Sequence, residues 1–156
     1  MFNRFAVVLL AAFVFALGGD VRPAHAGGNW IKKVVPYTQF EAVATTDTVV
    51  LYTTRAFESI DAVVMRRDVD FAGGSITSYT VSVGKSGATS KYQSATDVFT
   101  GVSNGNTNSI VTAGRGVEAS GVSIIATAVA SHNLSTATAG GLTFFIFVST
   151  IPPGTA

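Results

Sequence analysis

The sequence predicts an all-β fold, an antiparallel β-sandwich or jelly-roll-like single domain that follows an N-terminal apolar segment. The residues beyond position 26 are mostly Val, Thr, Ser, Ala, Gly and aromatics, which favour strands over surface helices. Apolar and polar residues alternate in several stretches, as they do in a strand with one solvent-facing side. Gly and Asn residues separate about eight such stretches, which is typical of a sandwich or jelly roll.

The N-terminal segment has the three parts of a secretory signal. Met1–Arg4 carries a positive charge, Phe5–Leu17 is an unbroken apolar run, and Ala24-His25-Ala26 has the small residues that a signal peptidase accepts. We therefore expect residues 1–26 to be a signal peptide that is cleaved and residues 27–156 to form the single β-sandwich domain. The apolar run has 13 residues, whereas a membrane-spanning helix needs about 20. An uncleaved anchor is the less favoured alternative.

Charge and cysteine content narrow the classes of function. Cleavage would remove two of the ten basic residues and one of the nine acidic residues, so the mature chain would be neutral. A neutral, weakly charged surface offers no electrostatic attraction for nucleic acid or anionic lipid. The chain has no cysteine, so an exported domain would be stabilised by packing and not by disulfide bonds.

The first half of the domain is expected to contain three strands. Val34–Val43 is the first, and Pro36 restricts it to a sheet edge or to the start of a strand. Thr48–Thr53 is the second, and Arg55–Ser59 forms a turn or a single helical turn after it. The third, Ile60–Phe71, alternates most clearly. One side of this strand is apolar, with Val63, Met65, Val69 and Phe71, and the other side is charged, with Arg66, Asp68 and Asp70.

The second half is expected to contain five further strands, some of them short. These are Ser75–Val83, Asp97–Thr100, Ser109–Thr112, Gly121–Ala130 and Leu142–Ile151. Turns or loops at Ala72–Gly74, Gly84–Gly87 and Gly101–Ser109 contain the Gly and Asn residues that tight turns favour. Ala126–Ala130 is also compatible with a helix. The last strand is apolar on both sides, so both of its faces must be covered.

The residues that catalysis and metal binding need are scarce. Gly84-Lys85 lacks the preceding glycine and the following helix of a phosphate-binding loop. His132 is the single histidine after residue 26, which leaves no Ser-His-Asp arrangement and no zinc site with two His or Cys ligands. We interpret Asp68 and Asp70 as part of a solvated strand face with cross-strand ion pairs. The alternative is that they bind a hard cation or act as paired carboxylates. We predict that the protein is not an enzyme and has no catalytic residue, cofactor or metal site.

Five aromatic residues leave two interpretations open. Flat rings could form a platform for sugars, whereas Tyr and Trp are equally common in sandwich cores and at protein interfaces. We favour the core or an interface. The residues are Trp30, Tyr37, Tyr52, Tyr79 and Tyr92.

Several stretches, in order along the chain, resemble a known group of proteins. They are Phe71–Gly84 (FAGGSITSYTVSVG), Lys91-Tyr92, Asp97-Val98-Phe99 and Asn133–Gly141 (NLSTATAGG). On these stretches the sequence resembles small β-rich structural proteins of tailed bacteriophages, of the kind that decorate a capsid or tail. The resemblance extends over roughly residues 37–152. It implies a β-sandwich subunit that assembles on a capsid or tail and carries no catalytic residues.

The signal-like segment, residues 1–26, departs from this family, because virion proteins assemble in the cytoplasm. The resemblance predicts a protein of the virion. The signal instead predicts export of a related domain to the periplasm, the cell surface or the extracellular space. In neither case do we expect stable membrane insertion after cleavage.

The last strand offers more apolar surface than one small core absorbs, and we expect it to form an assembly interface. The candidate residues are Leu142, Phe144, Phe145, Ile146 and Phe147. Of these, Phe145 and Phe147 are the best suited to face a neighbour. The partners would be copies of the same chain or a capsid, tail or surface scaffold. The alternative function is a secreted module that binds a carbohydrate or a cell-surface partner through loops such as Gly101–Ser109.

Overall fold

The computed structural model describes residues 28–99, 107–110 and 118–151. Within these ranges there are eight strands and two short 3-10 helices. The strands are β1 (Gly28–Pro36), β2 (Thr46–Thr53), β3 (Glu58–Ala72), β4 (Tyr79–Lys85), β5 (Ala88–Asp97), β6 (Thr107–Ile110), β7 (Ser123–Ala130) and β8 (Ala139–Thr150). The helices are η1 (Tyr37–Gln39) and η2 (Leu134–Thr136). The predicted signal peptide lies outside the described residues, as does most of the predicted loop Gly101–Ser109.

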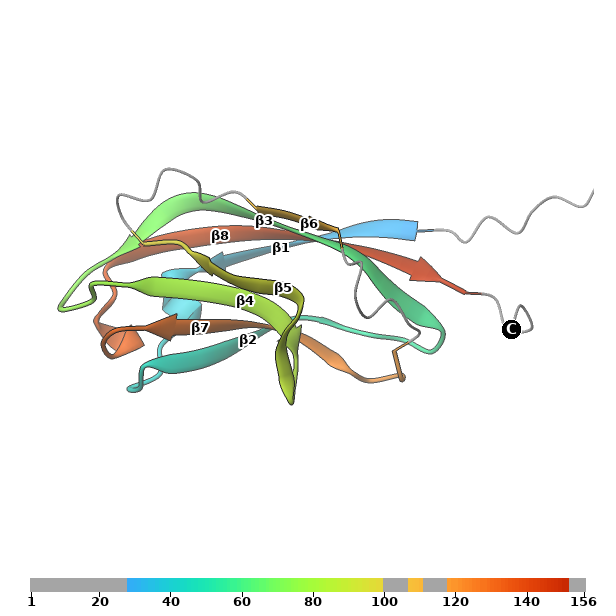
Figure 1. The fold of residues 1–156 in the computed structure, drawn as a ribbon, viewed down its shortest axis with the longest axis horizontal. Coiled ribbons are helices and arrows are strands. Elements are labelled where there is room, and N and C mark those ends of the chain that lie inside the picture. The colour runs from blue at the N-terminus through green and yellow to red at the C-terminus, as the bar shows by residue number, and fades with distance from the viewer. Residues whose placement is uncertain (1–27, 100–106, 111–117, 152–156) are drawn as a thin grey trace, which may run out of the picture.

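The strands form two four-stranded antiparallel sheets that face each other (Figure 1). Sheet A has the order β1-β8-β3-β6, and sheet B has the order β2-β7-β4-β5. Each strand pairs with its counterpart counted from the other end of the chain: β1 with β8, β2 with β7, β3 with β6, and β4 with β5. The chain is thus a long hairpin that turns between β4 and β5 and wraps into a sandwich. This is the eight-stranded jelly roll, so the predicted fold class is confirmed.

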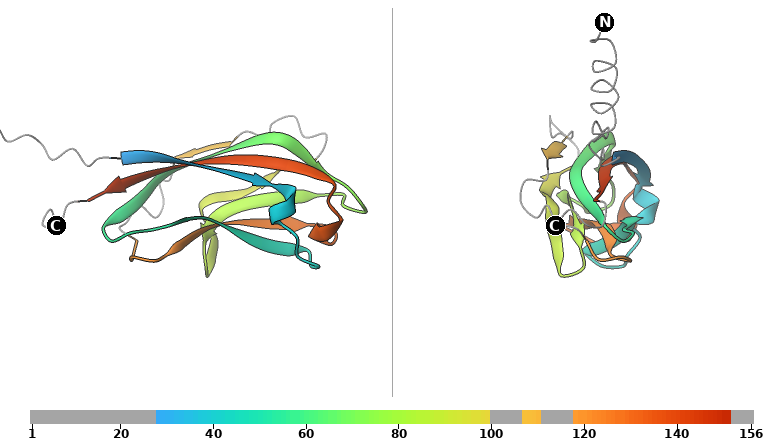
Figure 2. Two further views of the ribbon diagram at one scale, coloured as in Figure 1. Left: turned by 180° about the vertical axis from the view of Figure 1, so that it is seen from behind. Right: turned by 90° about the vertical axis from the view of Figure 1, so that its right-hand side faces the viewer.

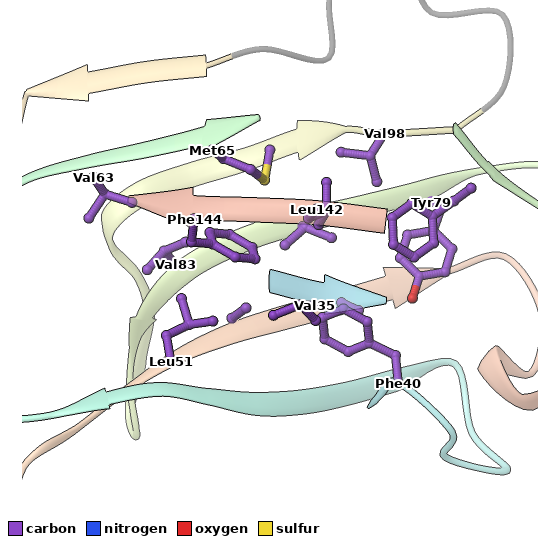
Figure 3. Close-up of a cluster of buried hydrophobic side chains, with 14 of the residues drawn as sticks. Val35, Phe40, Leu51, Val63, Met65, Tyr79, Val83, Val98, Leu142 and Phe144 are labelled. Atoms are coloured by element: carbon purple, nitrogen blue, oxygen red, sulfur yellow. The ribbon is translucent and has the colours of Figure 1, made fainter. Parts of the chain in front are cut away.

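A hydrophobic core fills the space between the sheets (Figure 3). Three of its fully buried aromatic rings, those of Phe40, Phe71 and Tyr79, come from different elements. The ring centroids of Phe71 and Tyr79 are 4.2 Å apart, and the Phe40 ring lies 6.4 Å from each. Because Phe71 belongs to β3 and Tyr79 to β4, this cluster joins sheet A to sheet B. Ring contacts of this kind stabilise a core beyond the burial of apolar area.

The two ends of the sandwich carry different elements (Figures 1 and 2). The terminal end contains the start of β1, the end of β8 and the turn 54–57 between β2 and β3. There the Ile151 N–H donates to the Phe57 carbonyl at 2.9 Å. The opposite end, the loop end, contains η1, η2 and the turn that includes Gly73 and Gly74. Both glycines have positive φ angles, which glycine adopts without strain, and the predicted turn is confirmed.

Several predicted strand boundaries are wrong. The first strand begins at Gly28 and ends at Pro36, and residues 37–39 form η1 instead of continuing it. Strand β4 begins at Tyr79, four residues after the predicted start. Strand β5 was predicted only at its last residue, because its Thr, Ser, Lys and Gln side chains give no apolar alternation. Residues 126–130 belong to β7, so the helical alternative is excluded.

The buried side of β3 also differs from the prediction at one position. Val63, Met65 and Phe71 are fully buried as predicted, but Val69 is 52 % exposed. The register of β3 against β8 shifts on both sides of Val69, between Arg67 and Val69 and again before Ala72. Such irregularities rotate the strand locally and re-aim its side chains.

Candidate assembly surface

Strand β8 lies between β1 and β3 in sheet A, and its side chains point alternately to the core and to the outer face. Leu142, Phe144 and Ile146 are 0 % exposed and belong to the core between the sheets (Figure 3 labels the first two). This corrects the prediction for these three side chains, which are not available to a partner of the folded subunit. Phe145 and Phe147 have the opposite orientation and are partly exposed on the outer face.

The outer face of sheet A carries apolar side chains in adjacent cross-strand rows. Residues directly opposed in an antiparallel pair lie on the same face of the sheet. The two rows, from β1 through β8 to β3, are Trp30–Phe147–Ala62 and Lys32–Phe145–Val64. Val34 follows on the same side of β1, opposite Thr143. We call the set Trp30, Val34, Val64, Phe145 and Phe147 the aromatic face.

Trp30 and Phe147 form an aromatic pair at the solvent boundary of this face. Their ring centroids lie 5.1 Å apart with the planes inclined by 50°. Phe147 lies over Gly28, where a Cβ atom would come within 2.2 Å of the ring. A glycine at the start of β1 therefore makes room for Phe147. Trp30 is still 55 % exposed and Val34 54 % exposed, with Lys32 between them on β1, so the isolated subunit leaves large apolar side chains in water.

Charged and polar side chains border the aromatic face on the β3 side. The Arg66 guanidinium lies 5.9 Å from the centroid of the Phe145 ring, which is a cation–π distance. Its Nε atom also pairs with Asp68 Oδ1 at 2.6 Å, and the Thr143 hydroxyl donates to Asp68 Oδ2. Burial raises the pKa of Asp68, but the hydrogen bonds from Thr143 and Arg66 outweigh it and hold this pKa below its ordinary value. An apolar centre with a polar border is the usual anatomy of a protein interface.

The outer face of sheet B is richer in hydroxyl groups. Two of its rows from β2 through β7 to β4 are Thr46–Val129–Thr80 and Thr48–Thr127–Ser82, and the next row, Val50–Ile125–Gly84, is apolar. Val129 is 45 % exposed and Val50 is 50 % exposed, but threonine side chains lie between them. Of the two sheets, sheet A therefore offers the more apolar outer face.

A second cluster surrounds the carboxylate of Glu118, which precedes β7 and is 5 % exposed. This carboxylate accepts hydrogen bonds from Lys85 Nζ at 2.8 Å, from the Tyr92 hydroxyl at 2.6 Å and from Lys91 Nζ. Burial raises the pKa of Glu118, but these hydrogen bonds outweigh it and lower the pKa to about 2. Lys85 belongs to β4, and Lys91 and Tyr92 belong to β5, so the Glu118 cluster ties its segment to the β4–β5 hairpin.

The other charged residues that the sequence singled out form ion pairs. Arg66 pairs with Asp68 as described, and Arg67 Nε pairs with Asp70 Oδ1 at 3.0 Å. Both aspartates form ion pairs as predicted, but the pairs lie within β3 and are not the cross-strand pairs that were expected. In the ranges 28–99, 107–110 and 118–151 no group of three or more His, Cys, Asp and Glu side chains is arranged to hold a metal ion. The same ranges contain no helix that is long and apolar enough to cross a bilayer.

The remaining sequence features are distributed over separate parts of the fold. Gly84–Gly87 spans the end of β4 and the turn to β5, where Gly87 has a φ of 78°, as predicted for a turn. The five aromatic residues considered as a sugar platform do not share a face. Tyr79 and Tyr92 are core residues, whereas Trp30 is exposed on sheet A.

Comparison with solved structures identifies a phage protein of similar fold. One match is a chain of the structure described as "Cyanophage Pam1 capsid asymmetric unit", with a TM-score of 0.59 and 19 % sequence identity. It covers 87 % of this chain and 96 % of that chain, so nearly the whole of that chain shares the jelly-roll arrangement. No protein-family model matches the chain, and no curated protein sequence matches it. The resemblance to phage structural proteins is thus supported at the level of the fold.

Trp30, Val34 and Val64 are the members of the aromatic face that the sequence did not assign to the assembly surface, although Trp30 was considered for the core or an interface. The first strand was predicted to begin at Val34, which left Trp30 outside it. The signal was present, because Trp30 and Val34 have the same parity on either side of Lys32. A period-two reading from Gly28 would have placed all three on one side of a strand.

Proposed function

We propose that this chain is a non-enzymatic structural subunit of a phage-type virion, and that it associates with copies of itself or with a capsid scaffold through the aromatic face. The observation that carries the proposal is the exposed apolar surface on sheet A of a jelly roll, a fold shared with a chain of a phage capsid. Jelly rolls also occur in lectin domains and cupins. A cupin-type metal site would need a cluster of ligands that the described residues do not contain.

The composition of the aromatic face supports a protein partner. Interfaces are enriched in Trp, Tyr and Phe, and a few such anchors supply most of the binding free energy. Trp30 and Phe147 form one aromatic pair and Phe145 lies in the next row, so the three rings occupy neighbouring positions. Backbone hydrogen bonds join β8 to β1 on one side and to β3 on the other, and this pairing fixes the positions of the three rings. A pre-ordered surface loses little conformational entropy on association.

The location of the protein is a separate part of the proposal. Association with a capsid places it in the virion, whereas cleavage after residue 26 would place it outside the cytoplasm. Intact-mass spectrometry of the natural protein distinguishes these cases. A chain that starts at Met1 fits assembly in the cytoplasm, and a chain that starts at Gly27 fits an exported subunit.

The test of the aromatic face is a charge introduced at its centre. Phe147→Asp should weaken self-association or scaffold binding by at least about tenfold, measured by sedimentation velocity over a concentration series. Val129→Asp is the control, because Val129 is an exposed apolar residue on the outer face of sheet B. Circular dichroism verifies that both variants fold.

The two outcomes have distinct meanings. Loss of association in Phe147→Asp but not in Val129→Asp supports the proposal. Equal association of both variants and the unchanged protein would overturn it for this face. A stable monomer that binds glycans on an array would instead favour the secreted binding module.

A further inference from the structure

A second apolar side chain is exposed at the terminal end of the sandwich, apart from the aromatic face. Phe57, in the turn between β2 and β3, is 48 % exposed and has a φ of 64°. This left-handed conformation suits glycine and strains a bulky L-residue. Strained positions of this kind occur most often at functional sites. An aromatic residue kept here in solvent is therefore a candidate for a contact.

The turn that carries Phe57 is held firmly by the residues around it. Glu58 is only 8 % exposed. Its carboxylate accepts hydrogen bonds from the Arg55 N–H at 2.7 Å and from the Tyr52 hydroxyl at 2.6 Å. The Phe57 carbonyl accepts from the Ile151 N–H at 2.9 Å. Phe57 is thus presented on a fixed frame, with the exposed side chain of Arg55 two residues before it.

The loop end of the sandwich contains a cavity of ≈ 220 Å³ beside η1 and η2. Its apolar lining comes from Phe40, Leu134 and Ala137, which are at most 9 % exposed. Tyr37 and Glu41 also line it, and Glu41 is exposed to solvent. Thr38 and Ser135 complete the lining, which is therefore mixed in polarity. Because a cavity of about 150 Å³ holds a benzene molecule, this one has the volume for a phenyl ring.

Beside this cavity, hydrogen bonds join the η2 segment to the segment that follows η1. The Leu134 N–H donates to the Ala44 carbonyl at 2.9 Å, and the Ser135 N–H donates to the Ala42 carbonyl at 3.2 Å. The segment around Ala42 is in turn fixed by the Asp47 carboxylate, which accepts from the Ala42 N–H at 3.1 Å. The short helices η1 and η2, beside the cavity, and the turn between β2 and β3 lie at opposite ends of the long axis (Figures 1 and 2).

We propose that Phe57 of one copy of the chain inserts into the cavity beside η1 and η2 of the next copy, head to tail, with Arg55 of the first copy pairing with Glu41 of the second. Opposite charges flank the aromatic ring and line the cavity, so the two ends are complementary in both shape and charge. A contact between different surfaces of the same chain is heterologous and closes into a ring or continues as a chain of subunits. The inference rests on the proposed function, because a shell needs subunits that contact neighbours through more than one surface.

Charge reversal tests the pairing directly. Arg55→Glu would place two glutamates together at the contact, and Glu41→Arg would place two arginines there. Each variant alone should associate end to end at least about tenfold more weakly than the unchanged chain. A one-to-one mixture of the two variants restores opposite charges at every contact, and it should recover association. Sedimentation velocity of each variant and of the mixture gives the comparison.

Further variants keep the test decisive. Arg55→Ala removes the charge without adding a carboxylate beside Glu58, so it covers the case in which Arg55→Glu disturbs the turn. Phe57→Ser should also abolish the contact, while Val43→Ser, at an 82 % exposed residue near the loop end, should leave it intact. The proposal is supported if each variant by itself associates weakly and the mixture of the two recovers association. A mixture that associates no better than the single variants contradicts it. These variants leave the aromatic face unchanged, so the two proposals can fail separately. If Phe147→Asp loses association and charge reversal has no effect, the end-to-end contact is overturned and the proposed function is not.

Discussion

Replacement of Glu118 by glutamine should destabilise the fold at neutral pH and have no effect in strong acid. The pKa of Glu118 is lowered from its ordinary value of 4.5 to about 2. One pKa unit corresponds to about 1.36 kcal/mol, so the ionised carboxylate adds about 3 kcal/mol to the free energy of unfolding. Because Lys85 and Lys91 keep side-chain exposures of 31 % and 23 %, we expect a measured loss nearer about 2 kcal/mol.

The sign of the pH dependence follows from the lowered pKa of Glu118. Its stabilising contribution is complete above the unfolded-state pKa near 4.5 and disappears as the pH falls toward the folded-state pKa of about 2. The difference in the free energy of unfolding between the original chain and Glu118→Gln should therefore be largest from pH 5 upward and should vanish near pH 2. Urea unfolding followed by circular dichroism at a series of pH values measures it.

Glu41→Gln is the control, because Glu41 is an exposed glutamate outside this cluster. It should change the free energy of unfolding by less than about 0.5 kcal/mol. Equal stability of Glu118→Gln and the original chain at pH 7 would refute the reasoning. So would a difference that stays constant from pH 7 to pH 2.

Three further predictions concern stability and use urea unfolding at pH 7. Phe144→Ala should lower the free energy of unfolding by about 3–5 kcal/mol because its ring lies in the core, whereas Phe145→Ala should lower it by about 1 kcal/mol. Equal losses would contradict the assigned orientations of the two side chains. Tyr79→Phe should stabilise the fold by about 1 kcal/mol, because the buried Tyr79 hydroxyl has no hydrogen-bond partner among the described residues; a loss above 1 kcal/mol would reveal a partner. Phe57→Gly should be more stable than Phe57→Ala by about 1 kcal/mol, because glycine relieves the strain of a positive φ; the reverse order would argue against strain.

The fold class could be predicted because strand period and turn composition agree along most of the chain. Ile60–Phe71 and the last strand have the alternation or the apolar content of sandwich strands, and glycines mark the turns at Gly73 and Gly87. Strand β5 could not be predicted in the same way. It lies at the edge of sheet B, where few of its side chains enter the core, so polar residues suffice.

The assembly surface could be predicted only in part from the sequence. Both parities of β8 are apolar, so the sequence alone could not tell which side faces the core. The structure resolves this, because Phe144 is enclosed between the sheets and Phe145 is not. Trp30 joins Phe147 only through the pairing of β1 with β8, which brings the two ends of the described chain together. Local patterns do not encode such long-range pairing.

The central claim is that the chain functions as an assembling subunit, and the most direct measurement is the molar mass of the native protein in solution. Light scattering over a concentration series, combined with the intact mass of the chain, gives the number of copies in each particle. The account predicts a defined assembly of several copies, or a stable complex with a capsid scaffold. A monomer at all concentrations, with no scaffold bound, would contradict it.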